Sequence, residues 1–457
     1  MTDELLAAVA ARITEYQRGI AERAVPARAG VAELKQLLGG PLPDGPTDAA
    51  AAIAALADAV DAGSLASTGP RYFGFVVGGA MPATVAADWL TSGVDMNAGG
   101  YVLGPAGAVV EEVAAAWLLD ILGLPADATV GFTTGAMMAN FTGLAAARHH
   151  VLAKSGWDVE RDGLQGAPRV HAVVGAERHV TIDSALRLLG LGHGTVHEVP
   201  ADAQGRLRPE MLAAVLADCD GPTIVCAQVG NVNSGACDPV GDISDLAHDR
   251  GAWVHVDGAF GLWAAASPAL RPLVAGLDRA DSWTTDAHKW LNVPYDAGLT
   301  IVAHPDAHRA PLRLTASYLE PEQDGQRDNS DYVPEMSRRA RGLTVWTALR
   351  TLGRSGVADL VDRCCAHARR FAEQLSAIDG VTVLNDVVLN QVVVRFRDSD
   401  DVTRRVVAGA QAEGTCWFGG TVWQGEVAAR ISVSNWSTTE ADVDRSVAAI
   451  RAVLAGL

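Results

Sequence analysis

This 457-residue sequence has no stretch with the character of a secretion signal or of a membrane-spanning helix. Two of its first four residues are acidic, whereas a secretion signal begins with basic residues and continues with an apolar run. Two long uncharged runs, residues 72–87 and 128–147, are broken by glycines, by Pro82 and by Asn140. We therefore expect a cytoplasmic protein that does not enter a membrane.

Basic residues are scarce relative to acidic ones: 36 Lys and Arg stand against 54 Asp and Glu, a net charge of −18. A surface of this sign repels nucleic acid and anionic lipid, so neither is expected as a partner. The six cysteines form no C-x-x-C pair and no zinc spacing, which predicts free thiols and no metal site. His193 and His197 are four residues apart, but the Gly and Thr between them disfavour a helical metal site, so we interpret both as structural.

The length predicts more than one domain. Residues 1–68 have the pattern of helices whose apolar faces need another domain or the partner subunit as cover. In residues 69–345, short apolar runs alternate with helical segments, which predicts a mostly parallel sheet with helices on both faces. Residues 346–457 have the pattern of a small α+β domain. The polar stretch 315–334 has no periodicity and is interpreted as a long surface loop of the kind that closes over active sites.

Two charged residues, Asp257 and Lys289, follow predicted strands of this sheet. Ligands bind at the carboxyl ends of strands in such sheets. A carboxylate and a lysine in these positions are what pyridoxal phosphate requires. The lysine forms a Schiff base with its aldehyde, and the carboxylate keeps the pyridine nitrogen protonated. Each residue alone is a weak signal, and the pair gains weight from the upstream segments.

Those upstream segments are a glycine-containing loop and a histidine. Gly131 and Gly135 lie just before a predicted helix, whose backbone N–H groups can cradle a phosphate. His179, in Glu177-Arg-His179, has the position of a residue that stacks on a cofactor ring. A single histidine after a strand is nevertheless more often structural.

The order of the Gly135 loop, His179, Asp257-Gly-Ala259 and His288-Lys289-Trp290 resembles the group II pyridoxal-phosphate-dependent decarboxylases. This family includes the aromatic L-amino acid, glutamate and histidine decarboxylases. The resemblance covers about residues 70–446. It implies the fold-type-I α/β fold, with a mostly parallel seven-stranded sheet and a small C-terminal α+β domain. It also implies pyridoxal phosphate as cofactor, an L-amino acid converted to its amine and CO₂, and a homodimer with shared active sites.

The resemblance also implies roles for individual residues. Lys289 would bind the cofactor aldehyde, Asp257 the pyridine nitrogen, Ala259 would lie beneath the ring and His179 above it. Tyr318 would protonate the carbanion, which favours plain decarboxylation, and Arg430 would lie near the substrate carboxylate. The other implied cofactor contacts are Gly135, Ala136, Met137, Gln228, Thr285, His288 and the partner subunit's Ser337. The expected side-chain pocket contains Phe75, Asn97 and Tyr295, whose mixed character suits aromatic or smaller polar substrates.

Several positions depart from the family pattern. Met137 and Met138 stand where relatives often have hydroxyl or amide side chains, and thioethers donate no hydrogen bond. Asp286 stands where many members have asparagine, and an anion near a phosphate is unfavourable. Two alternatives remain open: oxidative deamination or transamination on the same scaffold, and a catalytically silent binding homologue. The joint presence of Lys289, Asp257, His179 and Tyr318 argues against the silent homologue.

Overall fold

The computed structural model describes residues 2–192, 194, 196–314 and 326–457. The chain divides into two compact units. The first, which we call the sheet unit, contains Ala80–Arg369 and Asn385–Val392. The second, the terminal unit, contains Met1–Gly79, Arg370–Leu384 and Val393–Leu457. The domain boundaries expected from the sequence, at residues 68 and 345, stay a prediction. Among the described helices, none has the length and apolar character needed to cross a membrane.

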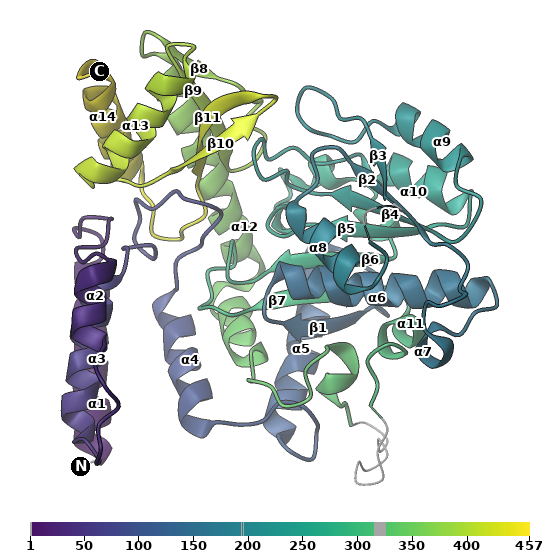
Figure 1. Cartoon of the computed structure of the whole chain (residues 1–457), viewed down its shortest axis with the longest axis horizontal. Helices are drawn as coiled ribbons and strands as arrows, with labels where there is room; N and C mark the ends of the chain where they lie inside the picture. Colours follow the sequence, from purple (N-terminus) through teal and green to yellow (C-terminus); the bar gives the residue numbers. More distant parts are fainter. Residues whose placement is uncertain (1, 193, 195, 315–325) are drawn as a thin grey trace. The chain divides into compact units, whose positions relative to one another are not determined.

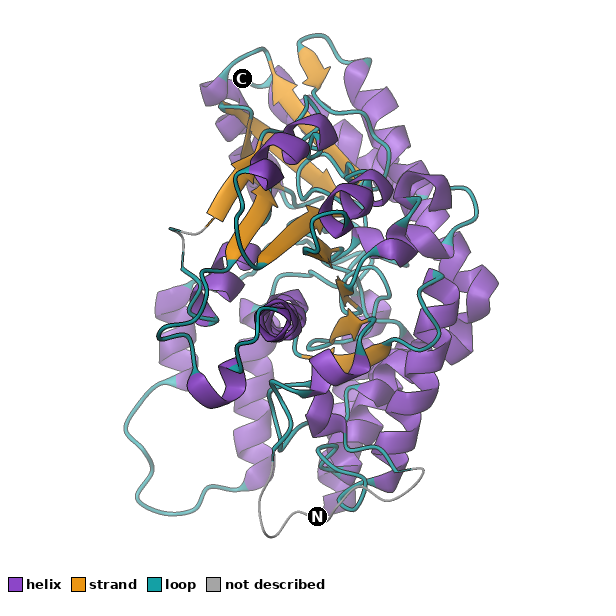
Figure 2. Cartoon of the chain, turned by 90° about the vertical axis from the view of Figure 1, so that its right-hand side faces the viewer, coloured by secondary structure: helices purple, strands orange, loops and turns teal. Residues whose placement is uncertain are grey.

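The sheet unit is built on a seven-stranded sheet whose central strands are parallel. Strands β6, β5, β4, β2 and β3 run parallel, whereas β7 is antiparallel to both of its neighbours, β1 and β6. Strands β5, β6 and β7 are buried along their whole length, as expected where helices cover both faces (Figure 2). In spatial order the strands are β1 (Thr129–Thr133), β7 (Gly298–Val302), β6 (Ser282–Asp286), β5 (Trp253–Asp257), β4 (Thr223–Gln228), β2 (His171–Gly175) and β3 (Val196–Val199).

Helix α6 (Ala136–Lys154) lies against β5, β6 and β7 and crosses the sheet in Figure 1. Most of its own residues are buried, many of them alanines, which is typical of a helix packed against a sheet. A Cβ at Gly143 would lie 2.9 Å from Cε1 of His255, so the helix approaches the sheet closely only with glycine there. The other helices that begin in this unit are α4 (Pro82–Val94), α5 (Pro105–Leu122), α7 (Val159–Asp162), α8 (Val180–Leu188), α9 (Pro209–Ala217), α10 (Val240–His248), α11 (Pro305–Arg309) and α12 (Gly342–Ser376).

Helix α12 is interrupted at Gly353, which has a φ of 62°. The expectation of a surface loop over 315–334 is wrong for its last part: Asn329 and Val333 are buried there. Residues 329–332 form a short 3-10 helix, and the ring of Tyr332 lies under the guanidinium of Arg327. Residues 315–325 lie outside the described chain.

The terminal unit combines a four-stranded sheet with helices from both ends of the chain. The sheet order is β10 (Gly419–Trp423), β11 (Glu426–Ser432), β9 (Gln391–Phe396) and β8 (Val381–Val383). Its helices are α1 (Thr2–Gly19), α2 (Val31–Leu38), α3 (Ala49–Gly63), α13 (Asp400–Glu413) and α14 (Glu440–Ala455). The N-terminal segment joins the C-terminal part directly, because the Val25 N–H donates to the Gly414 carbonyl. Its packing on a partner subunit stays a prediction.

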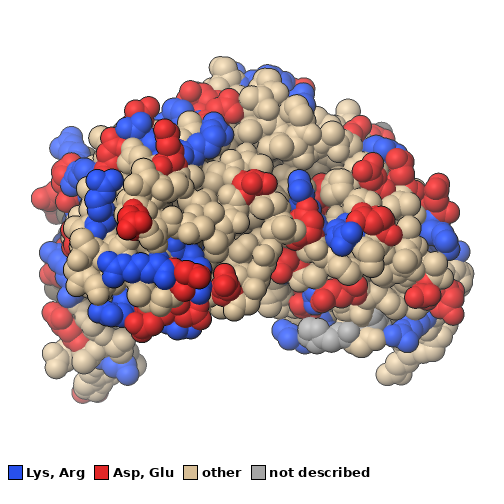
Figure 3. Space-filling model, turned by 90° about the horizontal axis from the view of Figure 1, so that it is seen from above, with Lys and Arg blue, Asp and Glu red and all other residues tan. Residues whose placement is uncertain are grey.

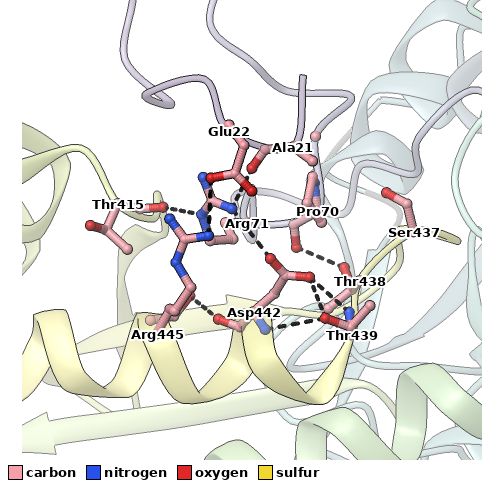
Figure 4. A network of polar contacts seen from close by, with 12 residues as sticks. Ala21, Glu22, Pro70, Arg71, Thr415, Ser437, Thr438, Thr439, Asp442 and Arg445 are labelled. Carbon is pink, nitrogen blue, oxygen red and sulfur yellow. Dashed lines mark hydrogen bonds and ion pairs between the residues drawn. The ribbon is translucent and has the colours of Figure 1, made fainter. Parts of the chain in front are cut away.

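Arg71 links these two ends of the chain (Figure 4). Its buried guanidinium donates to the carbonyls of Ala21 (2.5 Å) and Thr415 (2.7 Å) and lies 3.3 Å from the carboxylate of Asp442. Asp442 also completes the capping box of α14 with Thr439. The backbone around Arg71 is thereby held in place.

Charged side chains of both signs are interspersed on the face of the molecule in Figure 3. The excess of acidic residues is therefore not gathered into one block on this face.

Candidate active site

The predicted cofactor residues of the sheet unit lie in segments that meet at one edge of the sheet. Gln228 ends β4 and Asp257 ends β5, and their Cα atoms are direct register partners. Asp257 is in turn the register partner of Thr284 in β6, the strand that leads into Lys289. The carboxyl ends of parallel strands coincide, so the parallel pairing brings these side chains together.

The loop around Gly135 also reaches this edge. A Cβ at Gly298, the first residue of β7, would lie 2.4 Å from Cα of Gly135. The two backbone segments therefore approach so closely that Gly298 has no room for a side chain. Helix α6 begins at Ala136, and the first N–H groups of a helix lack intrahelical partners. Ala136 is buried and Met137 is exposed. The close approach of the glycines and the N–H groups at the start of α6 together make this an anion-binding position.

Asp257 is almost completely buried and is held by two donors. Nδ2 of Asn140 donates to Oδ2 of Asp257 (3.2 Å), and the N–H of Ala259 donates to Oδ1 (3.1 Å). Oδ1 of Asn140 lies 2.9 Å from Nε2 of His255, whose Nδ1 lies 2.8 Å from Oγ of Ser282. Burial lowers the pKa of His255 to about 3, so the ring is neutral. Because an amide oxygen only accepts, Nε2 of His255 carries the proton and fixes the orientation of Asn140.

Asn140 also connects Asp257 to His179. Its Nδ2 lies 3.4 Å from Oγ1 of Thr181, and that hydroxyl lies 2.8 Å from Nδ1 of His179. The N–H of Thr181 donates to the same nitrogen (3.3 Å), so His179 caps the start of α8. His179 therefore has a structural contact at the start of α8, and stacking over a cofactor ring stays a prediction.

Sequence reasoning missed Asn140 and Ser282 as parts of the site. A signal was present, because His255 and Asp257 are two residues apart on a strand and must share one face. A buried histidine beside a buried carboxylate on that face indicates a polar network. The partner 115 residues away on α6 could not be read from the pattern.

Gln228 belongs to a second network at the end of β4. Its side-chain oxygen accepts from Nδ2 of Asn231 (3.2 Å), which also donates to the carbonyl of Glu177, two residues before His179. The N–H of Gln228 donates to Asp238 (2.7 Å). Burial raises the pKa of Asp238 to about 7. Gln228 and the loop that carries His179 are thus held in one arrangement.

Lys289 is paired with Asp286 in the turn that follows β6. Nζ of Lys289 lies 2.8 Å from Oδ2 of Asp286, and Oδ1 of the same carboxylate accepts from the N–H of Ala136 (2.6 Å). His288 accepts a hydrogen bond at Nδ1 from the N–H of Ala297 (3.1 Å), and its ring centroid lies 4.3 Å from that of the exposed Tyr295. Burial lowers the pKa of His288.

Two threonines of β6, Thr284 and Thr285, precede the Lys289 turn. Oγ1 of Thr285 lies 3.5 Å from the carbonyl of Ala259, which places two predicted cofactor contacts side by side. The buried hydroxyl of Thr284 has no hydrogen-bond partner among the described residues. A buried donor of this kind is costly unless another molecule satisfies it.

The remaining predicted residues form two separate pairs. Nδ2 of Asn97 lies 3.5 Å from Oγ of Ser337 within the sheet unit. In the terminal unit, the side chain of Arg430 lies 3.5 Å from the carbonyl of Phe75, whose exposed ring stacks on Trp417 at 5.9 Å. Burial lowers the pKa of Arg430. Tyr318 lies outside the described residues.

One cluster of metal-binding side-chain types lies elsewhere in the sheet unit. Ligand atoms of His171, His197 and Cys219 lie within 4.8 Å of one another. Both ring nitrogens of His171 already have partners, because Nδ1 contacts His197 (2.9 Å) and Nε2 contacts Asp220 (3.1 Å). His171 begins β2, so the cluster lies at the amino ends of the strands, away from Lys289.

The family model and the curated relatives that match this chain are named as decarboxylases. A family model described as the pyridoxal-dependent decarboxylase conserved domain matches residues 32–397. The aromatic-L-amino-acid decarboxylase of Bacillus atrophaeus is 27% identical over 405 residues, which cover 84% of this chain and 81% of that protein. The L-2,4-diaminobutyrate decarboxylase of Rhizobium meliloti (strain 1021) is 29% identical over 384 residues, which cover 81% of this chain and 75% of that protein. The crystal structure of Oryza sativa TDC with PLP and tryptamine superposes with a TM-score of 0.93 at 25% sequence identity. The superposition covers 100% of this chain and 98% of that one.

Proposed function

The chain belongs to the family of pyridoxal-dependent decarboxylases and is an amino acid decarboxylase that uses pyridoxal phosphate, and we propose that it converts an aromatic L-amino acid to the amine and CO₂. The observation that carries the reaction is the buried Asp257 carboxylate, held by Asn140 and Ala259 on the strand beside the one that leads to Lys289. We assign Lys289 as the amine that binds the cofactor aldehyde.

The residues present fit this cofactor at three points. The start of α6, where Gly135 and Gly298 leave no side chain between them, suits a phosphate. The Asp257 carboxylate suits a protonated ring nitrogen, and the orphaned hydroxyl of Thr284 supplies a buried donor. We assign the other cofactor contacts as expected from the sequence, with Ala259 and His179 on the two sides of the ring. Among the described residues at the start of α6, Asp286 does not suit an anionic phosphate.

Pyridoxal phosphate supplies an electron-withdrawing ring that accepts the electron pair left when CO₂ departs. The protein's part is to keep that ring protonated. Asp257 would hold a proton on the ring nitrogen, because its carboxylate is buried and its donors, Asn140 and Ala259, orient both oxygens. The neutral His255 locks the Asn140 amide in the orientation that presents Nδ2 to Asp257.

Substrate recognition and proton return are assigned to residues of the terminal unit and of the segment outside the described residues. We propose that Arg430 binds the substrate carboxylate, since guanidinium groups form bidentate hydrogen bonds with carboxylates. Tyr318 is proposed to return a proton to the substrate carbon. These two roles rest on the match to the family pattern.

An aromatic substrate is supported by exposed aromatic side chains among the proposed pocket residues. Phe75 is 64% exposed and Tyr295 is 60% exposed, and aromatic rings offer a large apolar surface for a second ring. Asn97 is the polar member of the proposed pocket.

A homodimer with the partner subunit's Ser337 at the cofactor is also proposed. Apolar side chains of α4 and of the loop before α5 remain exposed in this chain, among them Leu90, Val102 and Leu103. Exposed apolar surface of this extent favours coverage by a second copy. A cytoplasmic location is supported by the six cysteines, none of which forms a disulfide.

The test is mass spectrometry of the products from purified, cofactor-loaded protein incubated in air with a panel of L-amino acids. A product at the substrate mass less CO₂ supports the proposal, and the most rapidly consumed substrate identifies the side chain. An aldehyde or amide product instead assigns the chain to the oxidative alternative, and a keto acid assigns it to transamination. Rapid turnover of acidic or diamino substrates with none of aromatic ones would contradict the aromatic assignment alone.

A further inference from the structure

Asp286 joins two positive groups of the proposed cofactor site. It ends β6, and its side chain is only 2% exposed. Oδ1 accepts from the N–H of Ala136, the first residue of α6, at 2.6 Å. Oδ2 lies 2.8 Å from Nζ of Lys289, and Nε2 of His288 lies 3.5 Å from Oδ1. One carboxylate therefore already pairs with the first N–H group of the helix and with the lysine.

The same carboxylate borders the space that a phosphate needs. A Cβ at Gly135 would lie 3.5 Å from Oδ1 of Asp286 and 3.2 Å from Cε1 of His288, so both side chains line the start of α6. The next side chains of the helix, Met137 and Met138, have no hydrogen-bond donor to offset a second anion. A phosphate bound beside this buried carboxylate would be repelled by it.

We propose that Asp286 is a resident anion that competes with the cofactor phosphate for the N-terminus of α6 and so weakens the retention of pyridoxal phosphate. This inference rests on the proposed cofactor site. Asp286 favours the cofactor-free protein in two ways, because it pairs the Lys289 ammonium and places a negative charge beside the Ala136 N–H, where the phosphate would bind. Only the second effect depends on the phosphate group, which allows the two to be separated.

The experiment compares pyridoxal phosphate with pyridoxal, which lacks the phosphate. Dissociation constants for both are measured by equilibrium dialysis with wild-type protein and with Asp286→Asn. Asparagine keeps the size of the side chain and an oxygen for the Ala136 N–H, but removes the charge. Loss of the Lys289 ion pair affects both compounds alike, so the quantity of interest is the ratio of their dissociation constants. We expect the preference for the phosphorylated form to rise about tenfold or more in Asp286→Asn.

Asp306→Asn is the matched control, because it removes the same charge from a side chain that is 100% exposed on α11. Its ratio is expected to equal that of the wild type. Asp286→Ser is a second neutral variant and replaces Asp286→Asn in the comparison if circular dichroism shows that the asparagine variant is unfolded.

The outcomes separate the inference from the proposed function. A ratio that is unchanged or lowered in the neutral variants overturns the competition. Wild-type protein that retains neither compound overturns the proposed cofactor site, and the inference falls with it. A raised ratio in each neutral variant that folds, with Asp306→Asn like the wild type, supports the inference without any measurement of catalysis.

Discussion

Asn140→Ala tests whether the buried network behind Asp257 contributes to catalysis. The substitution removes the donor at 3.2 Å from Oδ2 of Asp257 and leaves the protonated Nε2 of His255 without its acceptor at 2.9 Å. A hydrogen bond to a charged group contributes about 1.5–3 kcal/mol. If this bond is needed to keep Asp257 oriented in the transition state, kcat falls roughly tenfold to hundredfold, since about 1.4 kcal/mol corresponds to a factor of ten.

The substitution also has a cost in stability. An unpaired buried donor costs about 1–3 kcal/mol, so the free energy of unfolding should fall by that amount. Thr142→Val is the matched control, because this buried residue of the same helix donates only to the carbonyl of Met138. The control removes a hydroxyl from α6 but leaves the Asp257 network intact.

The assay measures kcat and KM with the best substrate of the panel, and urea unfolding in parallel. The proposed role predicts that kcat falls in Asn140→Ala while KM changes by less, and that Thr142→Val retains the wild-type kcat. A folded Asn140→Ala enzyme with kcat within about twofold of the wild type would refute the reasoning, because the bond would then contribute little to the transition state.

Three further predictions concern other residues. Asp257→Ala should lower kcat by orders of magnitude with an unchanged circular dichroism spectrum, because the ring nitrogen then loses its anionic partner; a fully active variant would exclude the role. Tyr318→Phe should divert product from amine toward a carbonyl compound, and an unchanged amine yield by mass spectrometry would count against the proposed proton donor. Burial lowers the pKa of both His255 and His308 to about 3, whereas the pKa in the unfolded chain is about 6.5. The unfolded chain therefore binds more protons, and the free energy of unfolding decreases as the pH falls below about 6.5. Between pH 7 and pH 5, each histidine should lower the free energy of unfolding, measured with urea, by about 2 kcal/mol. His308→Gln should reduce the slope of this free energy against pH by the equivalent of about one proton. An unchanged slope would show that His308 is not buried in its neutral form.

Local patterns in the sequence predicted most elements that carry the site. The predicted strand that leads to Asp257 corresponds to β5 (Trp253–Asp257), and the predicted helix after the Gly135 loop corresponds to α6 (Ala136–Lys154). Apolar runs and helical periodicity are patterns among residues close together in sequence, so they can be recognised without knowledge of the fold. Strands β1 and β3 were missed: β1 contains a central glycine, and β3 is only partly buried and has no continuous apolar run.

The contacts of the site were less accessible to sequence reasoning. The departure at Asp286 was visible, but its hydrogen bond to Ala136 joins residues 150 positions apart. The bond between Asn140 and Asp257 spans 117 positions. No periodicity indicates which residue of a distant helix faces the end of a given strand, because this depends on strand order and on the direction in which each helix crosses the sheet.

The sequence by itself determined the chemistry available: a lysine and a carboxylate at strand ends, a glycine loop before a helix, and the order that identifies the cofactor. Parallel pairing of β4, β5 and β6 then made the coincidence of Gln228, Asp257 and the Lys289 turn a geometric necessity. Only the tertiary structure decided that β7 runs antiparallel, which brings Gly298 against Gly135, and that Asp286 rather than a hydroxyl meets the start of α6. Side-chain types and local propensities are properties of the chain, whereas partners are chosen by packing between segments that are far apart in sequence.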